Sequence, residues 1–291
     1  MSTLLLLGAG FSRNWGGWLA SEAFEYLLGA PEVQADPYVR DLLWSNKEDG
    51  GFEGALATVQ SDYRRQPHEH LRHLQALQSS LEQMFLDMNR GLLENNDLEF
   101  QNGQERMLRT ALVRFDAIFT LNQDLLLEHR YLNDNVALAG PRRWDGFQLP
   151  GLVSRRSRLF PNVLSEAGKD FSPEADPALF VLAQRAQPVF KLHGSSNWTE
   201  QAGNQLLVMG GNKEGAIRLH PILLWYQELF ARYMAEPNSR LMTIGYGFRD
   251  IHINRAIELA AQDHGLRIFV VDPLGADLAR SLNRTAAPGQ I

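Results

Sequence analysis

The chain has 291 residues, of which 44% are hydrophobic, and it carries a formal net charge of −6. This length can form one large domain or two small ones with a sizeable core, and the acidic balance argues against direct nucleic-acid binding. Because no cysteine is present, disulfides, thiolate zinc sites and cysteine nucleophiles are excluded. We see no secretory signal and no apolar stretch near the roughly 18 residues of a membrane span, so we expect a soluble cytoplasmic protein without membrane contact.

The first strand is predicted at Thr3–Leu7, a short apolar run that is typical of a strand buried on both faces of a parallel sheet. The sequence GAGFS follows, in which Gly8 and Gly10 allow a tight turn and a close approach of backbone to a ligand. Ser12 can cap the next helix, and a helix N-terminus offers free amides to a phosphate. The same G-x-G also fits a simple strand-to-helix turn. A helical pattern continues at Leu19, Ala23, Tyr26 and Leu27.

A long amphipathic helix is predicted from Pro67 onward, because apolar residues recur every three or four positions, at Leu71, Leu74, Leu77, Leu81, Met84, Phe85, Met88 and Leu92. We interpret this stripe as core, with an oligomer contact as the alternative. The helix belongs to a helical insertion expected at about 30–105. A second, irregular insertion is expected at about 133–187, which is rich in Pro, Gly and Arg.

Further short strands are predicted at Phe115–Phe119, Pro188–Leu192, Leu206–Met209, Leu241–Ile244 and Ile268–Val271. Helical segments separate each of the last two strands from its neighbour. This alternation predicts an α/β, Rossmann-like fold with a mostly parallel sheet and helices on both faces.

Polar residues follow two of these strands at the end where an open α/β sheet binds its ligands. Thr120, Asn122 and Asp124 form a Thr-x-Asn-x-Asp motif after one strand, and His193 precedes Gly194 after the next. A histidine in this position can move protons near neutral pH. It also fits a loop histidine with local partners.

Two later strand ends carry similar signals. The sequence GYGFRDIHIN begins at Gly245 and Tyr246 and continues into a helix that Asp250 can cap. Asp272 ends the last strand, where an acidic group can accept hydrogen bonds from a ribose or cap the turn before Pro273.

Two clusters of charged or polar residues have ordinary explanations. His68, His70 and His73 lie close in sequence, but only the last two share a helix face, so we favour a solvated helix start over a metal site. A basic cluster fits a solvated or subunit-contacting loop better than a phosphate or nucleic-acid contact; it comprises Arg142, Arg143, Arg155, Arg156 and Arg158.

The order of the motifs is more informative than any one of them. Gly-Ala-Gly-x-Ser, Thr-x-Asn-x-Asp, His-Gly, a Gly-rich strand end and Val-Asp-Pro together resemble the sirtuin (SIR2) superfamily, across a span from Gly8 to Pro273. The chain looks most similar to the SIR2-like domains of bacterial antiphage defence systems, because GYGFRDIHIN resembles a pattern of that branch. The resemblance implies one SIR2-like domain over residues 1–291.

The resemblance also implies roles for individual residues. Asn122 and His193 would flank the nicotinamide ribose of NAD as the catalytic pair, Asp124 would hold the carboxamide and Asp272 would contact the adenosine ribose. The remaining cofactor contacts would come from the glycine loop and the other strand ends, at Gly8, Ala9, Gly10, Phe11, Ser12, Thr120, Gly194, Gly245 and Tyr246.

These residue types suit cleavage of the bond between ribose and nicotinamide. The sugar develops positive charge as neutral nicotinamide departs, so the site must hold the ribose and place one nucleophile. Asn122 can orient a water without carrying charge, and His193 can accept its proton, while Asp124 can stabilise nearby positive charge. We therefore expect NAD hydrolysis to nicotinamide and ADP-ribose, with a rate that falls as His193 protonates.

Some departures from the family pattern weaken a protein deacylase assignment. The four-cysteine zinc module of the deacylases is absent, so no zinc and no other metal is expected, and Gly247 replaces a serine of the family pattern. A zinc-free deacylase, an ADP-ribosyl transferase and a non-catalytic NAD- or ADP-ribose-binding module remain alternatives. By analogy with the family we expect a homo-oligomer, with a HerA-type ATPase or a short Argonaute as a partner.

Overall fold

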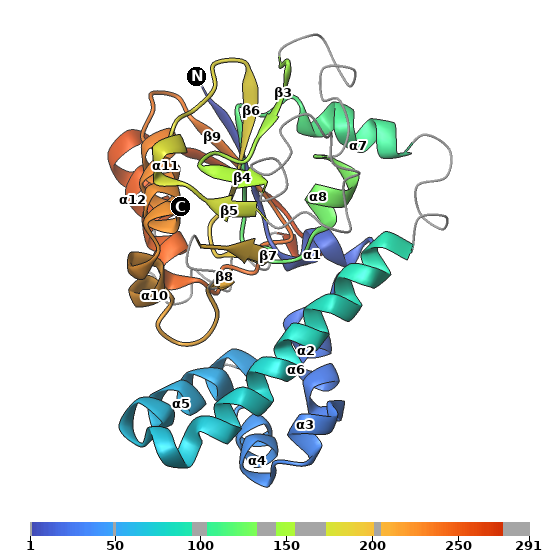
Figure 1. The fold of residues 1–291 in the computed structure, drawn as a ribbon. Helices are drawn as coiled ribbons and strands as arrows, with labels where there is room; N and C mark the ends of the chain where they lie inside the picture. Colours follow the sequence, from blue (N-terminus) through green and yellow to red (C-terminus); the bar gives the residue numbers. More distant parts are fainter. Residues whose placement is uncertain are drawn as a thin grey trace.

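A six-stranded sheet forms the centre of the computed structural model, which describes residues 2–48, 51–94, 104–132, 144–154, 173–200 and 205–275. The strand order is β10-β9-β1-β2-β6-β3, and every pair of neighbours is parallel (Figure 1). The strands are β1 (Thr3–Leu7), β2 (Ala117–Thr120), β3 (Gly146–Gln148), β6 (Ala186–Lys191), β9 (Arg240–Ile244) and β10 (Arg267–Val271). The predicted α/β, Rossmann-like fold class is confirmed.

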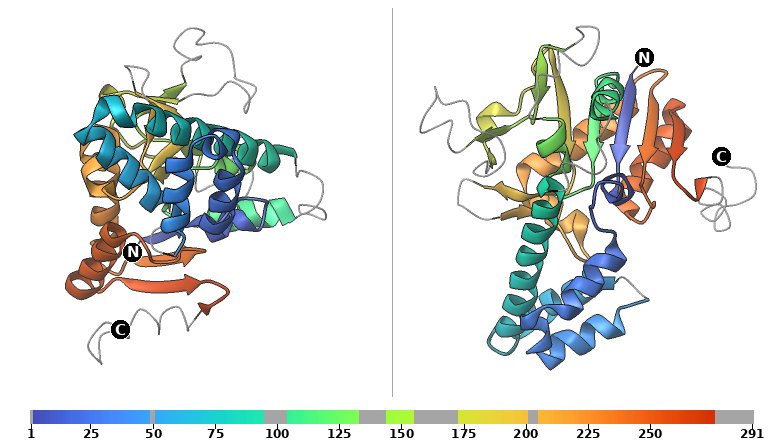
Figure 2. Two further views of the ribbon diagram at one scale, coloured as in Figure 1. Left: turned by 90° about the horizontal axis from the view of Figure 1, so that it is seen from below. Right: turned by 90° about the vertical axis from the view of Figure 1, so that its right-hand side faces the viewer.

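The central strand is β1, which pairs with β2 on one side and β9 on the other. Leu4, Leu5, Leu6 and Leu7 are fully buried, because helices flank both faces of the sheet: α11 (Pro221–Met234) and α12 (Ile251–His264) on one side, α7 (Gln104–Leu112) and α8 (Leu126–Arg130) on the other (Figures 1 and 2). The strand order reverses between β1 and β9. In open α/β sheets, ligands bind at the carboxyl ends beside such a switch point.

A second, smaller sheet has the order β4-β5-β7-β8. Its strands are β4 (Leu152–Ser154), β5 (Pro173–Ala175), β7 (Gly194–Thr199) and β8 (Gln205–Leu207). The strand expected at Leu206–Met209 is therefore β8, which runs antiparallel to β7 outside the parallel sheet. The expected irregular insertion at 133–187 contains β3, β4, β5 and the 3-10 helix η3 (Pro177–Leu179) in its described parts; residues 133–143 and 155–172 lie outside the described ranges.

Five helices form a helical unit beneath the sheet: α2 (Ala20–Gly29), α3 (Pro31–Gln34), α4 (Pro37–Ser45), α5 (Gly51–Arg65) and α6 (Pro67–Glu94). The long helix expected from Pro67 is confirmed as α6, with 28 residues. Figure 1 shows α6 running from the helical unit up to the sheet. Its apolar stripe is mostly buried, although Leu71 is exposed, so the interpretation of the stripe as core holds for the part that packs on α5.

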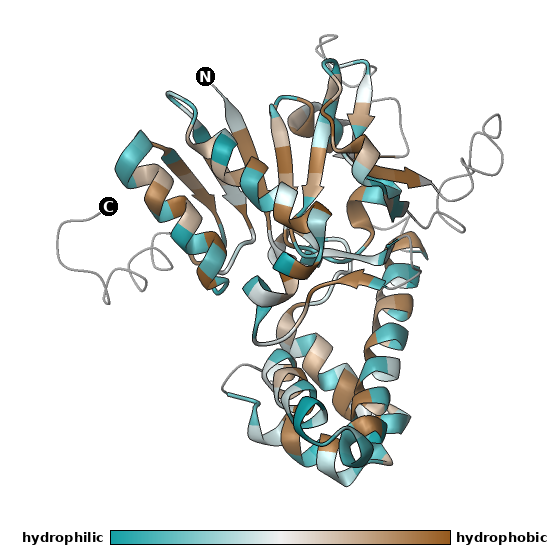
Figure 3. Ribbon diagram, turned by 60° about the vertical axis from the view of Figure 1, so that its left-hand side comes forward, coloured by the Kyte–Doolittle hydropathy of each residue, from teal (hydrophilic) through white to brown (hydrophobic). Residues whose placement is uncertain are grey.

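Apolar segments concentrate on the strands of the parallel sheet and on the inner sides of the helices (Figure 3). The buried apolar residues form a cluster that includes both β1 and the helical unit, so the two parts share a core. Within the described ranges, none of the helices has the length and apolar character needed to cross a membrane.

Two glycine loops meet backbone to backbone at the switch point. The amides of Gly8 and Gly10 donate to the carbonyls of Ile244 and Gly245, each at 3.0 Å. A Cβ atom on Gly8 would lie 2.5 Å from the Gly245 carbonyl oxygen, and one on Gly245 would lie 2.3 Å from the Phe11 nitrogen. The close approach that these glycines permit is therefore an approach between two protein loops.

Gly245→Ala should destabilise the protein by at least about 2 kcal/mol, because Gly245 has φ +62 and its Cβ would meet backbone atoms that have no room to move. Gly247→Ala is the matched control. A Cβ there has no neighbour within 4 Å, and we expect a change within about 0.5 kcal/mol. Urea unfolding of the two variants measures the difference; equal stabilities would contradict the packing described.

Candidate functional site

The predicted site residues lie at the carboxyl ends of β1, β2, β6, β9 and β10. Thr120 is in register with Leu7 of β1 and with Lys191 of β6. Asn122 lies two residues after Thr120, and His193 lies two residues after Lys191. The two residues therefore leave the sheet at neighbouring positions. The backbone of the two loops stays joined, because Ser196 donates its amide to the Gln123 carbonyl at 3.0 Å.

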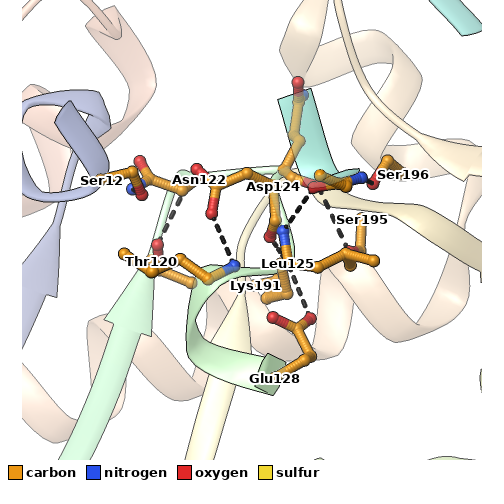
Figure 4. A network of polar contacts seen from close by, with 12 residues as sticks. Ser12, Thr120, Asn122, Asp124, Leu125, Glu128, Lys191, Ser195 and Ser196 are labelled. Atoms are coloured by element: carbon orange, nitrogen blue, oxygen red, sulfur yellow. Dashed lines mark hydrogen bonds and ion pairs between the residues drawn. The ribbon is translucent and has the colours of Figure 1, made fainter. Parts of the chain in front are cut away.

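The side chain of Asn122 ties its motif to the glycine loop. Its Nδ2 donates to the Gly8 carbonyl at 3.0 Å and to Ser12 Oγ at 2.9 Å, and its backbone amide donates to Thr120 Oγ1 (Figure 4). Ser12 therefore serves as a partner of Asn122. It caps neither neighbouring helix, since it lies within α1 (Ala9–Arg13), and the capping expected for it is wrong.

Three amides of the glycine loop are already used within the protein. Gly8 donates to Ile244, Gly10 donates to Gly245, and Phe11 donates to the Gly8 carbonyl at 2.9 Å. The helix in this loop has only five residues. A phosphate that bound through these three amides would therefore have to displace backbone hydrogen bonds.

A buried ionic group lies below Asn122. Lys191 Nζ donates to Glu128 Oε1 at 2.7 Å and to the backbone carbonyl of Asp124 at 2.5 Å (Figure 4). Burial raises the pKa of Asp124, an effect opposed by Lys191 and by hydrogen bonds from the Leu126 amide and the Ser12 hydroxyl. Neither Lys191 nor Glu128 was among the residues predicted from the sequence. Lys191 could have been noticed in the sequence, because it is a charged residue at the end of an otherwise apolar strand, just before Leu192 and His193.

These side chains line one narrow crevice. Five of the predicted cofactor or catalytic residues meet there, together with Leu127, Glu128 and Lys191; the five are Phe11, Ser12, Thr120, Asn122 and Asp124. The space inside is too narrow for a water molecule. The crevice is closed in this structure, and His193 is not part of its lining.

His193 lies against His252 instead. The two Nε2 atoms are 3.0 Å apart, and His193 is only 2% exposed. Burial lowers the pKa of His193 to about 3, although Asp250 acts in the opposite direction. The ring is therefore neutral near pH 7 but is a weaker base than an ordinary histidine, so the titration near neutral pH expected for His193 is wrong for this buried position. His252 was part of the quoted GYGFRDIHIN sequence but was given no role there.

Asp250 connects this pair of histidines to the helical unit. Its Oδ1 lies 2.8 Å from Lys213 Nζ, and the same nitrogen lies 2.9 Å from Glu53 Oε2 in α5. Although burial raises the pKa of Asp250, the nearby His193 and Lys213 hold it below its usual value overall. Asp250 occupies the N-cap position of α12 as expected, but its side chain makes no capping hydrogen bond.

The last predicted residues have local partners. Tyr246 donates its hydroxyl to Asn254 Oδ1 at 2.7 Å, and Asn254 Nδ2 donates to the Phe248 carbonyl, which holds Phe248 at φ +53. Gly194 has φ +76, and a Cβ there would lie 2.0 Å from the Leu206 carbonyl oxygen in β8. Asp272 accepts from the Leu274 amide at 2.8 Å, which is the turn-capping alternative named above. A ribose contact by Asp272 stays a prediction.

The clusters set aside in the sequence analysis do not join this site. His73 Nδ1 pairs with Asp36 Oδ2 at 2.5 Å inside the helical unit, where the rings of His70 and Tyr38 contact it. His73 is buried, so the solvated helix start expected for this cluster is wrong for that residue. The arginine cluster at residues 142, 143, 155, 156 and 158 lies outside the described residues.

Comparison with known proteins adds no assignment: no family model matches the chain, and no curated protein matches it. The fold and the site define an α/β protein with a parallel sheet, whose polar motifs gather at the carboxyl ends of the strands beside the switch point.

Lys191→Met should destabilise the protein by about 3 kcal/mol, because it leaves Glu128 buried without its cation. Adding Glu128→Gln should recover at least about 1 kcal/mol, since the uncompensated charge is then removed. Urea unfolding of the two single variants and the double variant gives the coupling. Additive effects would mean that the two side chains are not an interacting buried pair.

Proposed function

We propose that the protein hydrolyses NAD at the bond between nicotinamide and ribose, giving nicotinamide and ADP-ribose. The observation that carries this proposal is the convergence of the motifs: Asn122 bonds to the Gly8–Ser12 loop and emerges beside His193 on the neighbouring strand. These are the residues that the resemblance to the SIR2 superfamily selects, although Asn122 lies 114 positions from Gly8 and 71 positions from His193 in the sequence.

In the proposed reaction, His193, Asn122 and Asp124 each have one role. The bond from C1′ of the ribose to the pyridinium nitrogen breaks, and its electron pair leaves with nicotinamide. A water oxygen bonds to C1′ and passes its proton to the neutral ring of His193. Asn122 holds the water or a ribose hydroxyl, and the Asp124 region receives the carboxamide.

The closed crevice is compatible with an enzyme that is silent until triggered. NAD would have to part the Gly8–Ser12 loop from Asn122 and move His193 away from His252. Control by a homo-oligomer or by a partner protein, and a role in antiphage defence, extend the proposal by family analogy alone.

Purified protein incubated with NAD should release nicotinamide, at a low rate if the protein is alone and at a higher rate once a trigger is present, and chromatography measures this release directly. Asn122→Ala and His193→Ala should each lower the rate by at least about 100-fold, because one removes the orienting amide and the other the proton acceptor. His264→Ala changes an exposed histidine on α12 and should leave the rate unchanged.

Release that persists in both site variants would contradict the proposed site. A second candidate function, NAD binding without turnover, is favoured by the engagement of His193 with His252, which occupies the nitrogen that would accept the proton. Its signature would be a rise in melting temperature with NAD and no nicotinamide release, either alone or after candidate partners are added.

A further inference from the structure

Three potential metal ligands lie together at the ends of β6 and β9. His193 follows β6, while Asp250 and His252 lie at the start of α12. One ligand atom from each residue can be chosen so that all three lie within 4.8 Å of one another. The hydrolysis proposed above uses only His193, so it does not account for the cluster as a set.

We propose that this cluster binds a divalent first-row transition metal ion, with Zn²⁺ as the probe, through Nε2 of His193, Nε2 of His252 and a carboxylate oxygen of Asp250. Two imidazoles and a carboxylate are a common ligand set for zinc with one position left open for water. The absence of cysteine excludes thiolate sites but not a site of this kind.

The spacing of the two histidines suits such an ion. Zinc–nitrogen bonds of about 2.0–2.1 Å in tetrahedral geometry put the two nitrogens roughly 3.3 Å apart, and the observed separation is 3.0 Å. The carboxylate of Asp250 is the ligand that has to move closer, by rotation of its own side chain. In the described residues, this is the group with three suitable side chains in reach of one ion.

The charged groups around the three proposed ligands include one cation that opposes metal binding and two carboxylates that offset it. A neutral imidazole can offer the lone pair of Nε2 to a metal ion, and the two Nε2 atoms already lie 3.0 Å apart. Lys213 is the opposing cation, bound to Asp250 Oδ1. Because Lys213 also pairs with Glu53 at 2.9 Å, it keeps a partner if Asp250 turns toward the ion. Glu214 adds a further negative charge near His252.

A metal here would occupy the nitrogen that His193 needs as a proton acceptor. Metal binding should therefore inhibit NAD cleavage, a consequence that rests on the proposed function. The binding itself does not rest on it, since the three ligands are defined by position alone.

Equilibrium dialysis of chelator-stripped protein against Zn²⁺, read by metal analysis, tests the binding. We expect one Zn²⁺ per chain in the wild type. His252→Gln and Asp250→Asn should weaken binding at least about tenfold, whereas Lys213→Gln should tighten it, because it removes the opposing charge. His264→Gln, on the exposed end of the same helix, is the matched control and should bind as the wild type does.

Absence of bound Zn²⁺, or binding that is equal in the wild type, His252→Gln and Asp250→Asn, would overturn the proposal. Circular dichroism of each variant shows whether it is folded, and the opposite direction expected for Lys213→Gln cannot be produced by unfolding. Zinc that is lost only in a His68→Gln/His70→Gln variant would place the ion in the helical unit and would also overturn it.

Nicotinamide release measured in the same samples separates the two proposals. Release that falls in step with bound Zn²⁺ and returns with chelator supports the inhibition. If the stripped protein releases no nicotinamide but binds Zn²⁺ through these residues, the hydrolase proposal loses support and the metal site stands. Full release with Zn²⁺ bound would contradict the inhibition.

Discussion

The backbone contact between the Gly8–Gly10 loop and Gly245 is the constraint on which the arrangement of the site depends. It joins the ends of β1 and β9 where the strand order reverses, and it leaves no space for a side chain at Gly8, Gly10 or Gly245. Asn122 then bonds to the outer side of the same loop through Gly8 and Ser12. The glycines therefore determine how closely the motif after β9 approaches the motifs after β1 and β2.

Polar side chains connect this region to the helical unit in two places. Lys213 bridges Glu53 of α5 and Asp250 beside the histidine pair. Asn89 of α6 accepts from the Leu125 amide and donates to Ser196 Oγ, so it contacts the loop after β2 and also β7, the strand that follows His193. Both links are partly or fully shielded from water, where hydrogen bonds and ion pairs are stronger than at the surface. The helices at 31–94 thus hold the site loops as well as forming a core of their own.

The parts of the fold that could be predicted are those with strong local patterns. The continuous apolar run of β1 and the three- and four-residue spacing of apolar positions in α6 can both be recognised in the local sequence alone. The three-residue strand β3 was missed, because its few residues carry no pattern, and the side-chain roles of Ser12 and Asp250 were predicted wrongly, because tertiary partners displaced local capping. At the site, the order of motifs predicted which loops would meet. It could not predict Lys191 with Glu128, or His193 with His252, since these pairs depend on packing between residues far apart in sequence.

Closure of the crevice at Asn122 affects how tightly any ligand can appear to bind. A ligand that enters only an open form has its apparent affinity reduced by the fraction of molecules that are open. If about one molecule in a hundred were open, the apparent Kd would be about a hundredfold weaker than the intrinsic value. Since Asn89 on the 28-residue α6 contacts the loop after β2 and also β7, a protein that binds the far end of this helix could change that fraction without touching the ligand. The fraction of crevices that hold a ligand would then depend on whether a protein is bound at the far end of α6.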